Sequence, residues 1–178
     1  MPRRVGTAAV LVIGDEILSG RTREANAATI ACRLAEHGIA VREVRIVPDD
    51  AAEIAAAVNE LRRRYTHLLT TGGIGPTHDD VTADGVARAF GVGIDIDERA
   101  LAILRARVQP SRLSEARMRT ARLPFGADLV VSPMTKAPGF RIGNVFVMAG
   151  VPEILQAMLA AACGMLASEG WPRRDAED

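Results

Sequence analysis

The residues best suited to chemistry lie in one segment, Thr70 to Thr82, which reads Thr-Thr-Gly-Gly-Ile-Gly-Pro-Thr-His-Asp-Asp-Val-Thr. Glycine has no Cβ atom, so a glycine-rich backbone can turn sharply and approach a ligand closely. The next residues, Val81 to Phe90, are predicted to form a helix, whose first amides favour an anion such as phosphate. The segment therefore predicts a phosphate-binding loop made of Thr71, Gly72, Gly73, Gly75, Pro76 and Thr77.

Two carboxylates, Asp79 and Asp80, follow this loop directly. Carboxylates repel a bare phosphate, and a divalent cation that bridges carboxylate and phosphate oxygens removes the conflict. The loop therefore predicts a cofactor such as Mg²⁺, Mn²⁺ or Co²⁺. The simpler alternative is a strand-to-helix turn in which an aspartate only caps the helix.

Acidic residues also follow the two preceding predicted strands, as Asp15-Glu16 and Asp49-Asp50. Because ligands of parallel sheets bind beyond the carboxyl ends of the strands, we expect the three acidic loops to meet around one crevice. The predicted catalytic residues are Asp49 and Asp80, and the predicted metal ligands are Asp15, Glu16, Asp79 and Asp80. Ser19 and Asn26 complete the predicted ligand site, and Asn26 also stands where it would cap the next helix.

The elements that position these residues alternate between strand and helix. Residues 8–13 are continuously apolar, which is typical of a strand buried on both faces, and residues 40–47 have the mixed polarity of a strand near a sheet edge. The order strand-helix-strand-helix-strand-helix predicts right-handed crossovers and a mainly parallel sheet. Residues 140–142 and 144–148 predict an antiparallel hairpin around Gly143. The fold class is therefore a three-layer α/β/α domain whose mainly parallel sheet carries an antiparallel hairpin.

A second helix-like stretch, residues 112–122, carries Arg112, Arg117, Arg119 and Arg122. Two interpretations remain open. The arginines belong to a solvated helix surface, which is the simpler one, or they form a cationic lid over a phosphate-bearing ligand.

Composition bounds the class of protein. The 178 residues fit a single domain, predicted over residues 1–170 and followed by a polar, frayed tail over residues 171–178. Lys+Arg and Asp+Glu both number 22, so the net charge is zero, which argues against a general binder of nucleic acids or membrane surfaces.

Cys32 and Cys163 are far apart on predicted helices, which predicts buried, reduced thiols and a cytoplasmic location. The apolar run before Gly14 is too short for a membrane anchor.

Three motifs carry a resemblance to a known family: residues 14–20 (Gly-Asp-Glu-Ile-Leu-Ser-Gly), residues 47–50 (Val-Pro-Asp-Asp) and residues 71–82. With them the chain resembles the molybdopterin-binding (MoaB/Mog-like) domains. It is most similar to the N-terminal domain of the competence/damage-inducible CinA proteins and to the molybdopterin-binding-like domain of FAD synthase. It departs from the common pattern of the late loop at Ser132, Thr135 and Ala149.

The resemblance implies a molybdopterin-binding-like fold, a small-molecule nucleotide or pterin as partner, and a homo-oligomer. For the CinA-like branch it implies metal-dependent hydrolysis of a dinucleotide pyrophosphate of the ADP-ribose or FAD type. For the molybdenum-cofactor branch it implies adenylation of molybdopterin with magnesium, served by residues that match Asp49 and Asp80. A non-catalytic binder of molybdopterin or a nucleotide is a third alternative.

Overall fold

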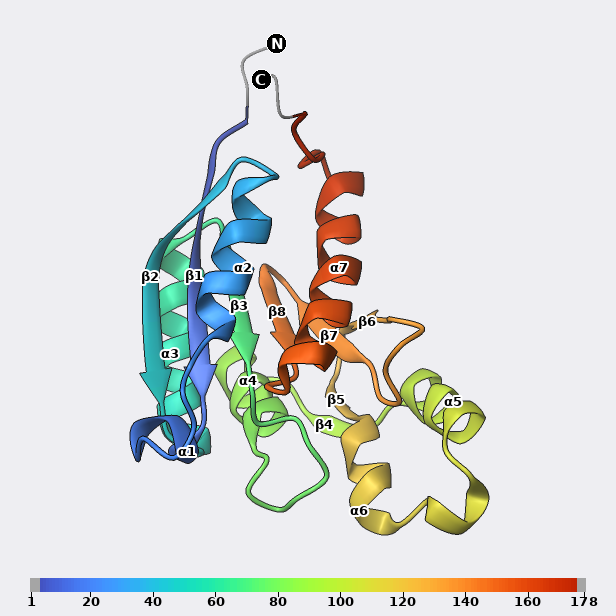
Figure 1. The fold of residues 1–178 in the computed structure, drawn as a ribbon. Helices are drawn as coiled ribbons and strands as arrows, with labels where there is room; N and C mark the ends of the chain where they lie inside the picture. Colours follow the sequence, from blue (N-terminus) through green and yellow to red (C-terminus); the bar gives the residue numbers. More distant parts are fainter. Residues whose placement is uncertain (1–3, 176–178) are drawn as a thin grey trace.

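The computed structural model describes residues 4–175, which form one six-stranded sheet, a small two-stranded sheet and the surrounding helices (Figure 1). The strand order in the large sheet is β2-β1-β3-β8-β7-β6. Its strands are β1 (Gly6–Ile13), β2 (Ile39–Val47), β3 (His67–Thr71), β6 (Asp128–Val130), β7 (Gly139–Ile142) and β8 (Val145–Met148). The first four in this order are parallel to one another, while β7 is antiparallel to both of its neighbours, β8 and β6. The predicted sheet, its hairpin and the edge position of β2 are thereby confirmed.

Helices cover both faces of the sheet. The first core joins β1, β3 and β8 to α3 (Ala51–Arg64), α4 (Thr82–Phe90) and α5 (Glu98–Arg107). The second core joins the same strands to α2 (Asn26–Ala35) and α7 (Pro152–Ser168), which lie side by side on the opposite face (Figure 1). Along β1, Leu11 belongs to the first core and Val10 to the second. Because successive side chains of a strand point to opposite faces, a strand between two helical layers is apolar throughout.

The short elements lie around this framework. They are α1 (Asp15–Leu18), β4 (Ile94–Ile96), η1 (Pro110–Arg112), α6 (Glu115–Met118), η2 (Arg119–Ala121) and β5 (Arg122–Pro124). The last four replace the single helix predicted over residues 112–122. That prediction is wrong because Ser114 interrupts the stretch: its backbone is extended, and its hydroxyl accepts a hydrogen bond from the Arg117 amide at the start of α6. The backbone then becomes extended at Arg122, where β5 begins and pairs with β4.

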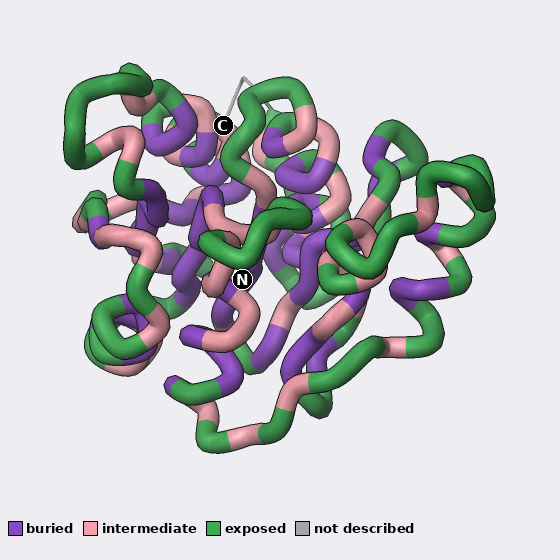
Figure 2. The backbone as a smooth tube through the Cα atoms, turned by 90° about the horizontal axis from the view of Figure 1, so that it is seen from below, coloured by how far each residue is buried: buried purple, intermediate pink, exposed green. Residues whose placement is uncertain are grey.

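The register of the parallel strands aligns their carboxyl ends. Val12 of β1 lies opposite Ile46 of β2 and Thr71 of β3, and Thr71 lies opposite Met148 of β8. The loops that follow β1, β2, β3 and β8 therefore leave the sheet at one end. Figure 2 views the molecule from that end, where exposed loops surround the buried strands.

Two predictions about buried and exposed residues are wrong. Trp171, assigned to a polar tail, is only 3% exposed and belongs to the second core. The Arg174 amide also donates a hydrogen bond to the carbonyl of Glu36, so the chain stays attached beyond α7. Cys32, predicted to be buried, is exposed on α2, whereas Cys163 on α7 is buried as expected. None of the helices in the described residues has the length and apolar character that crossing a bilayer requires.

Candidate functional site

The glycine loop after β3 is fixed by two residues in the left-handed region, Gly72 with φ 102° and Gly73 with φ 72°. A Cβ atom on Gly72 would lie 2.2 Å from the carbonyl oxygen of Ile13, and one on Gly73 would lie 2.1 Å from Oγ1 of Thr82. Thr82 in turn donates a hydrogen bond from its hydroxyl to the carbonyl of Gly72, at 2.9 Å. Only glycine fits both positions, because the backbone of β1 and the start of α4 press against the loop from two sides.

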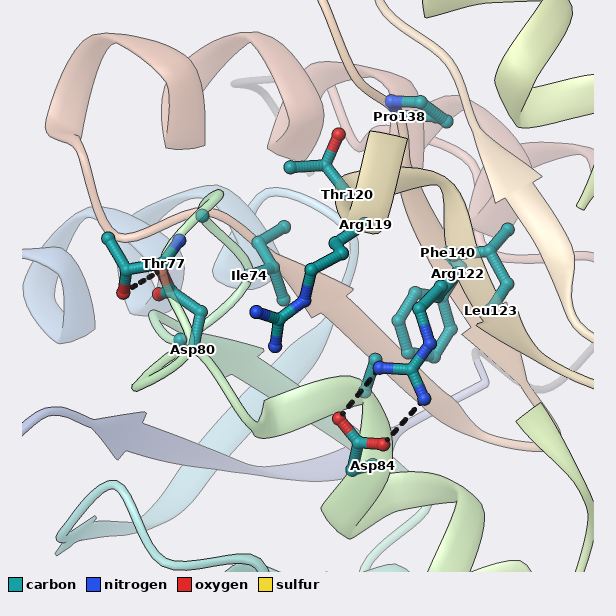
Figure 3. A pocket seen from close by; sticks show the side chains of 13 residues that line it. Ile74, Thr77, Asp80, Asp84, Arg119, Thr120, Arg122, Leu123, Pro138 and Phe140 are labelled. Carbon is teal, nitrogen blue, oxygen red and sulfur yellow. Dashed lines mark hydrogen bonds and ion pairs between the residues drawn. The ribbon is translucent and has the colours of Figure 1, made fainter. Parts of the chain in front are cut away.

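One side of the loop opens into a hollow, shown in Figure 3, which we call the arginine hollow. It is lined by Gly73, Ile74, Gly75, Thr77, Asp80, Ala83, Asp84, Arg119, Thr120, Arg122, Leu123, Pro138 and Phe140. Within residues 4–175, the amides of Gly73, Ile74 and Gly75 donate no hydrogen bond to another protein group. Three adjacent unpaired donors beside two arginines make this wall of the hollow suited to an anion.

Asp80 lies in the arginine hollow and accepts hydrogen bonds from the amide and hydroxyl of Thr77, at 3.0 and 2.8 Å. The N-cap of α4 is instead Val81, without a side-chain cap. The simpler interpretation, in which an aspartate of this loop caps the helix, is therefore wrong. Asp80 closes a turn of the loop and leaves its carboxylate at the wall of the hollow.

Asp15 and Asp49 are brought together at the ends of β1 and β2. The Asp15 amide donates to the Asp49 carboxylate at 3.0 Å, and the Asp49 amide donates to the Asp15 carboxylate at 3.0 Å. Burial raises the pKa of Asp49, and the negative charges of Asp15, Glu16 and Asp80 raise it further. The acidic loops thus lie close enough for their charges to act on one another, but they do not surround one crevice as the sequence predicts, because only Asp80 of the three aspartates lines the arginine hollow.

The other side of the glycine loop opens into a second hollow, which we call the asparagine hollow. Glu16, Asn26, Thr71 and Gly72 of the predicted site lie in its wall, together with residues of the loop that follows α1. Asn26 is 9% exposed, and its amide group donates to the Thr71 hydroxyl at 3.0 Å and to the Gly150 carbonyl at 2.8 Å. The predicted cap is wrong, because Asn26 is the first residue of α2, and the Glu24 carboxylate accepts hydrogen bonds from the amides of Asn26 and Ala27.

The remaining predicted residues lie outside both hollows. Asp15 and Asp49 line neither, Pro76 is exposed, and Ser19 is exposed with its hydroxyl donating to the Glu16 carbonyl. Asp79 is exposed beside His78, 3.6 Å away. The structure therefore divides the predicted site between two hollows and the Asp15–Asp49 pair.

The carboxylates do not form a complete protein cage for a metal. Among the described residues, no group of three or more His, Cys, Asp or Glu side chains is placed to hold one ion. Mg²⁺, however, is commonly bound by one or two carboxylates together with substrate phosphate oxygens. The concentration of negative charge that raises the pKa of Asp49 fits a cation of that kind.

Sequence reasoning missed most of the wall opposite the glycine loop. Asp84 and Arg122 form an ion pair there at 3.0 Å, and the hollow is closed by Phe140 of β7 and by Pro138, which directly precedes this strand. The available signal was the run of arginines in residues 112–122, but spacing along a supposed helix does not tell which of them faces a ligand.

Comparisons with known proteins agree with this architecture. A family model described as "Probable molybdopterin binding domain" matches residues 9–167. A CinA-like protein of Citrifermentans bemidjiense is 44% identical over 157 residues, which cover 85% of this chain and 38% of that protein. A protein of Thermococcus kodakarensis is 40% identical over 166 residues, 85% of this chain and 66% of its own length. The chain therefore spans less than two thirds of either relative.

Solved structures show the same fold. The crystal structure of the CinA protein with unknown function from Thermoplasma acidophilum matches with a TM-score of 0.80 and 36% identity, over 87% of this chain and 95% of that one. The molybdopterin biosynthesis enzyme MoaB from Thermus thermophilus matches with a TM-score of 0.60 and 16% identity, over 93% and 94% of the two chains. The matching family model and the CinA-like relatives lead to one conclusion: this chain belongs to the molybdopterin-binding domain family, in its CinA-like branch.

Proposed function

We propose that this domain binds a phosphate-bearing nucleotide or pterin in the arginine hollow and, with a divalent cation, hydrolyses a dinucleotide pyrophosphate of the ADP-ribose or FAD type. The observation that carries the proposal is the set of unpaired amides at Gly73, Ile74 and Gly75, which border a hollow that also contains two arginines. Gly73 and Ile74 are half-buried, where an amide without a partner is costly, and Gly75 is exposed. A phosphate oxygen is a partner that satisfies several adjacent amides at once.

Hydrolysis adds water across the P–O–P linkage and releases two phosphomonoesters. Asp49 is not in the wall of the arginine hollow, but its carboxylate is close enough to Asp80, which is, for their charges to interact. The direction of its pKa shift, upward, suits a carboxylate that orients water and accepts its proton. Asp80, with Asp15 or Glu16 of the first acidic loop, would hold the divalent cation. When bound, that ion polarises a phosphoryl oxygen and lowers the pKa of its water.

The family membership favours one other ligand, molybdopterin. In that case the same hollow serves either adenylation of the pterin with ATP or binding without turnover. The three functions differ in what they consume. Release of AMP from ADP-ribose or FAD supports the pyrophosphatase, pterin-dependent use of ATP supports the adenylyltransferase, and pterin binding without turnover supports a carrier or sensor.

The test is a panel assay of ADP-ribose, FAD and related pyrophosphates with Mg²⁺, Mn²⁺ and Co²⁺. We expect Asp49→Asn and Asp80→Asn each to lower kcat by about 100-fold or more, the usual contribution of a positioned acid or base. Asp128→Asn, an exposed carboxylate on β6, serves as the matched control and keeps wild-type activity.

Two results would contradict the proposal at different points. If the wild-type domain hydrolyses no member of the panel with any of the metals, the pyrophosphatase assignment is wrong. If it does hydrolyse one but both variants keep full activity, the reaction stands and the roles given to Asp49 and Asp80 are wrong.

A further inference from the structure

The four arginines of residues 112–122 are not equivalent in the structure. Arg112 and Arg117 line neither hollow. Arg122 lines the arginine hollow, but its guanidinium is occupied by Asp84, at 3.0 and 3.4 Å. Arg119 also lines this hollow, and within residues 4–175 its side chain makes no ion pair or hydrogen bond. In Figure 3 its guanidinium points into the space between the Thr77–Asp80 turn and the Arg122–Asp84 pair.

The backbone under Arg119 is well anchored. Arg119 begins η2, and Ala121, two residues later, is fully buried in the first core. The Ala121 carbonyl accepts a hydrogen bond from the Asp97 amide at 2.8 Å, and the Thr120 hydroxyl donates to the Arg117 carbonyl at 2.6 Å. A free guanidinium is therefore held over the hollow by a fixed turn.

The charges in the hollow explain why an unpaired arginine matters. Asp84 is neutralised by Arg122, whereas Asp80 accepts hydrogen bonds from Thr77 and pairs with no cationic side chain of the described residues. A phosphate that binds to the loop amides comes close to the Asp80 carboxylate and is repelled by it. Arg119 supplies a compensating positive charge on the facing wall, with planar N–H donors that match phosphate oxygens.

We infer that Arg119 is the phosphate-binding residue that lets an anion enter the arginine hollow, and that this binding needs no metal ion. The inference rests on the proposed phosphate site and assigns the charge compensation there to the protein itself. The divalent cation is then needed for hydrolysis and not for holding the ligand. The ligand must carry a phosphate group, since a nucleoside alone offers nothing to Arg119, and the proposed function makes that group a diphosphate.

The experiment is calorimetric titration of the domain with ADP, and with adenosine as the uncharged control, in buffer that contains EDTA. We expect wild type to bind ADP and Arg119→Ala to bind it about 10- to 100-fold more weakly, the usual effect of losing a charge-assisted contact. Arg119→Lys keeps the charge without the planar fork and should fall between the two. Arg117→Ala, two residues away and outside the hollow, is the matched control and should bind like wild type.

A second readout separates binding from a change in folding. The affinity of wild type for ADP should fall as salt rises, and this dependence should be weaker in Arg119→Ala, because one charge contact is missing. Thermal melting of each variant checks that the domain is folded, and the exposed position of Arg119 means that the melting temperature should not change.

The outcomes separate this inference from the proposed function. Equal ADP affinity of wild type and Arg119→Ala in EDTA overturns the role of Arg119. Binding by wild type that appears only when Mg²⁺ is added overturns the metal-independent step and leaves the proposed site standing. If wild type binds neither ADP nor pyrophosphate under any condition, the proposed phosphate site itself is wrong.

Discussion

At the amino end of β3, His67 is 5% exposed and packs edge-on against Trp171, with ring centroids 5.3 Å apart. The guanidinium carbon of Arg4 lies over the indole, 4.2 Å from the ring centroid. At the carboxyl end of the same strand, the glycine loop has backbone donors that find no protein partner in the described part of the chain, and it faces Arg119, which is unpaired within that part. One end of the sheet is sealed by apolar and aromatic groups, and the other is left open and charged.

Both ends hold a titratable group whose charged form is disfavoured by burial. Burial lowers the pKa of His67 to about 4, and the nearby Arg141 and Arg4 lower it in the same direction. Burial also raises the pKa of Asp49, together with its acidic neighbours. At neutral pH, however, His67 is neutral, although its two buried ring nitrogens have no hydrogen-bond partner in the described residues, whereas burial and acidic neighbours oppose the ionised form of Asp49. An unfavourable charge kept at neutral pH is typical of a functional site, and a group kept neutral by burial is typical of a structural core.

The largest expected effect comes from removing Trp171, which packs against His67 at the amino end of the sheet. Trp171→Ala should lower the free energy of unfolding by about 3–5 kcal/mol, because a buried indole is lost and a cavity remains beside Gly6, whose added Cβ would lie 2.6 Å from the ring. Urea denaturation measures this change. Asp175→Ala, an exposed neighbour, should change it by less than about 0.5 kcal/mol. A loss below about 1 kcal/mol for Trp171→Ala would mean that this end is not sealed.

An intermediate effect is expected from acid. A histidine whose pKa is about 4 in the folded protein and about 6.5 in the unfolded chain takes up its proton mainly on unfolding. Stability should therefore fall by about 2–3 kcal/mol between pH 7 and pH 4.5 through this group. Denaturation curves measured at several pH values give the free energy of unfolding, and this free energy should change less with pH for His67→Leu than for wild type. The exposed His78, replaced by Asn, should leave the slope unchanged, and an equal slope in His67→Leu would refute the prediction.

The smallest effect is expected at the carboxyl end of the sheet, where replacing Asp49 should raise and not lower the stability. Because the pKa of Asp49 is raised in the folded protein, its ionised form destabilises the fold, so Asp49→Asn should be more stable at pH 7 by about 0.5 kcal/mol, limited by solvent screening. The gain should shrink as the pH falls below about 4, because protonation then removes the charge of the aspartate in both states. Melting temperatures at pH 7 and pH 3.5 test this. A less stable variant at pH 7 would mean that Asp49 serves the fold and not the site.

Much of the framework was predictable because its signals are local. Residues 8–13 indicate a doubly buried strand by themselves, and the glycine loop is recognisable because Gly72 and Gly73 adopt backbone angles that other residues avoid. The approach of Asp15 to Asp49 followed from the parallel order of β1 and β2. The role of Asn26 was not predictable, since its partners Thr71 and Gly150 lie 45 and 124 residues away.

The sequence by itself determined the layers of this domain, its family and the place of the glycine loop, because apolar periodicity and backbone preference are properties of neighbouring residues. Only the tertiary structure decided which arginine is free and which is paired, that Trp171 is part of the core, and that the predicted site residues divide between two hollows. Those outcomes depend on contacts between segments far apart in the chain, and the packing of the sheet and its helices sets such contacts.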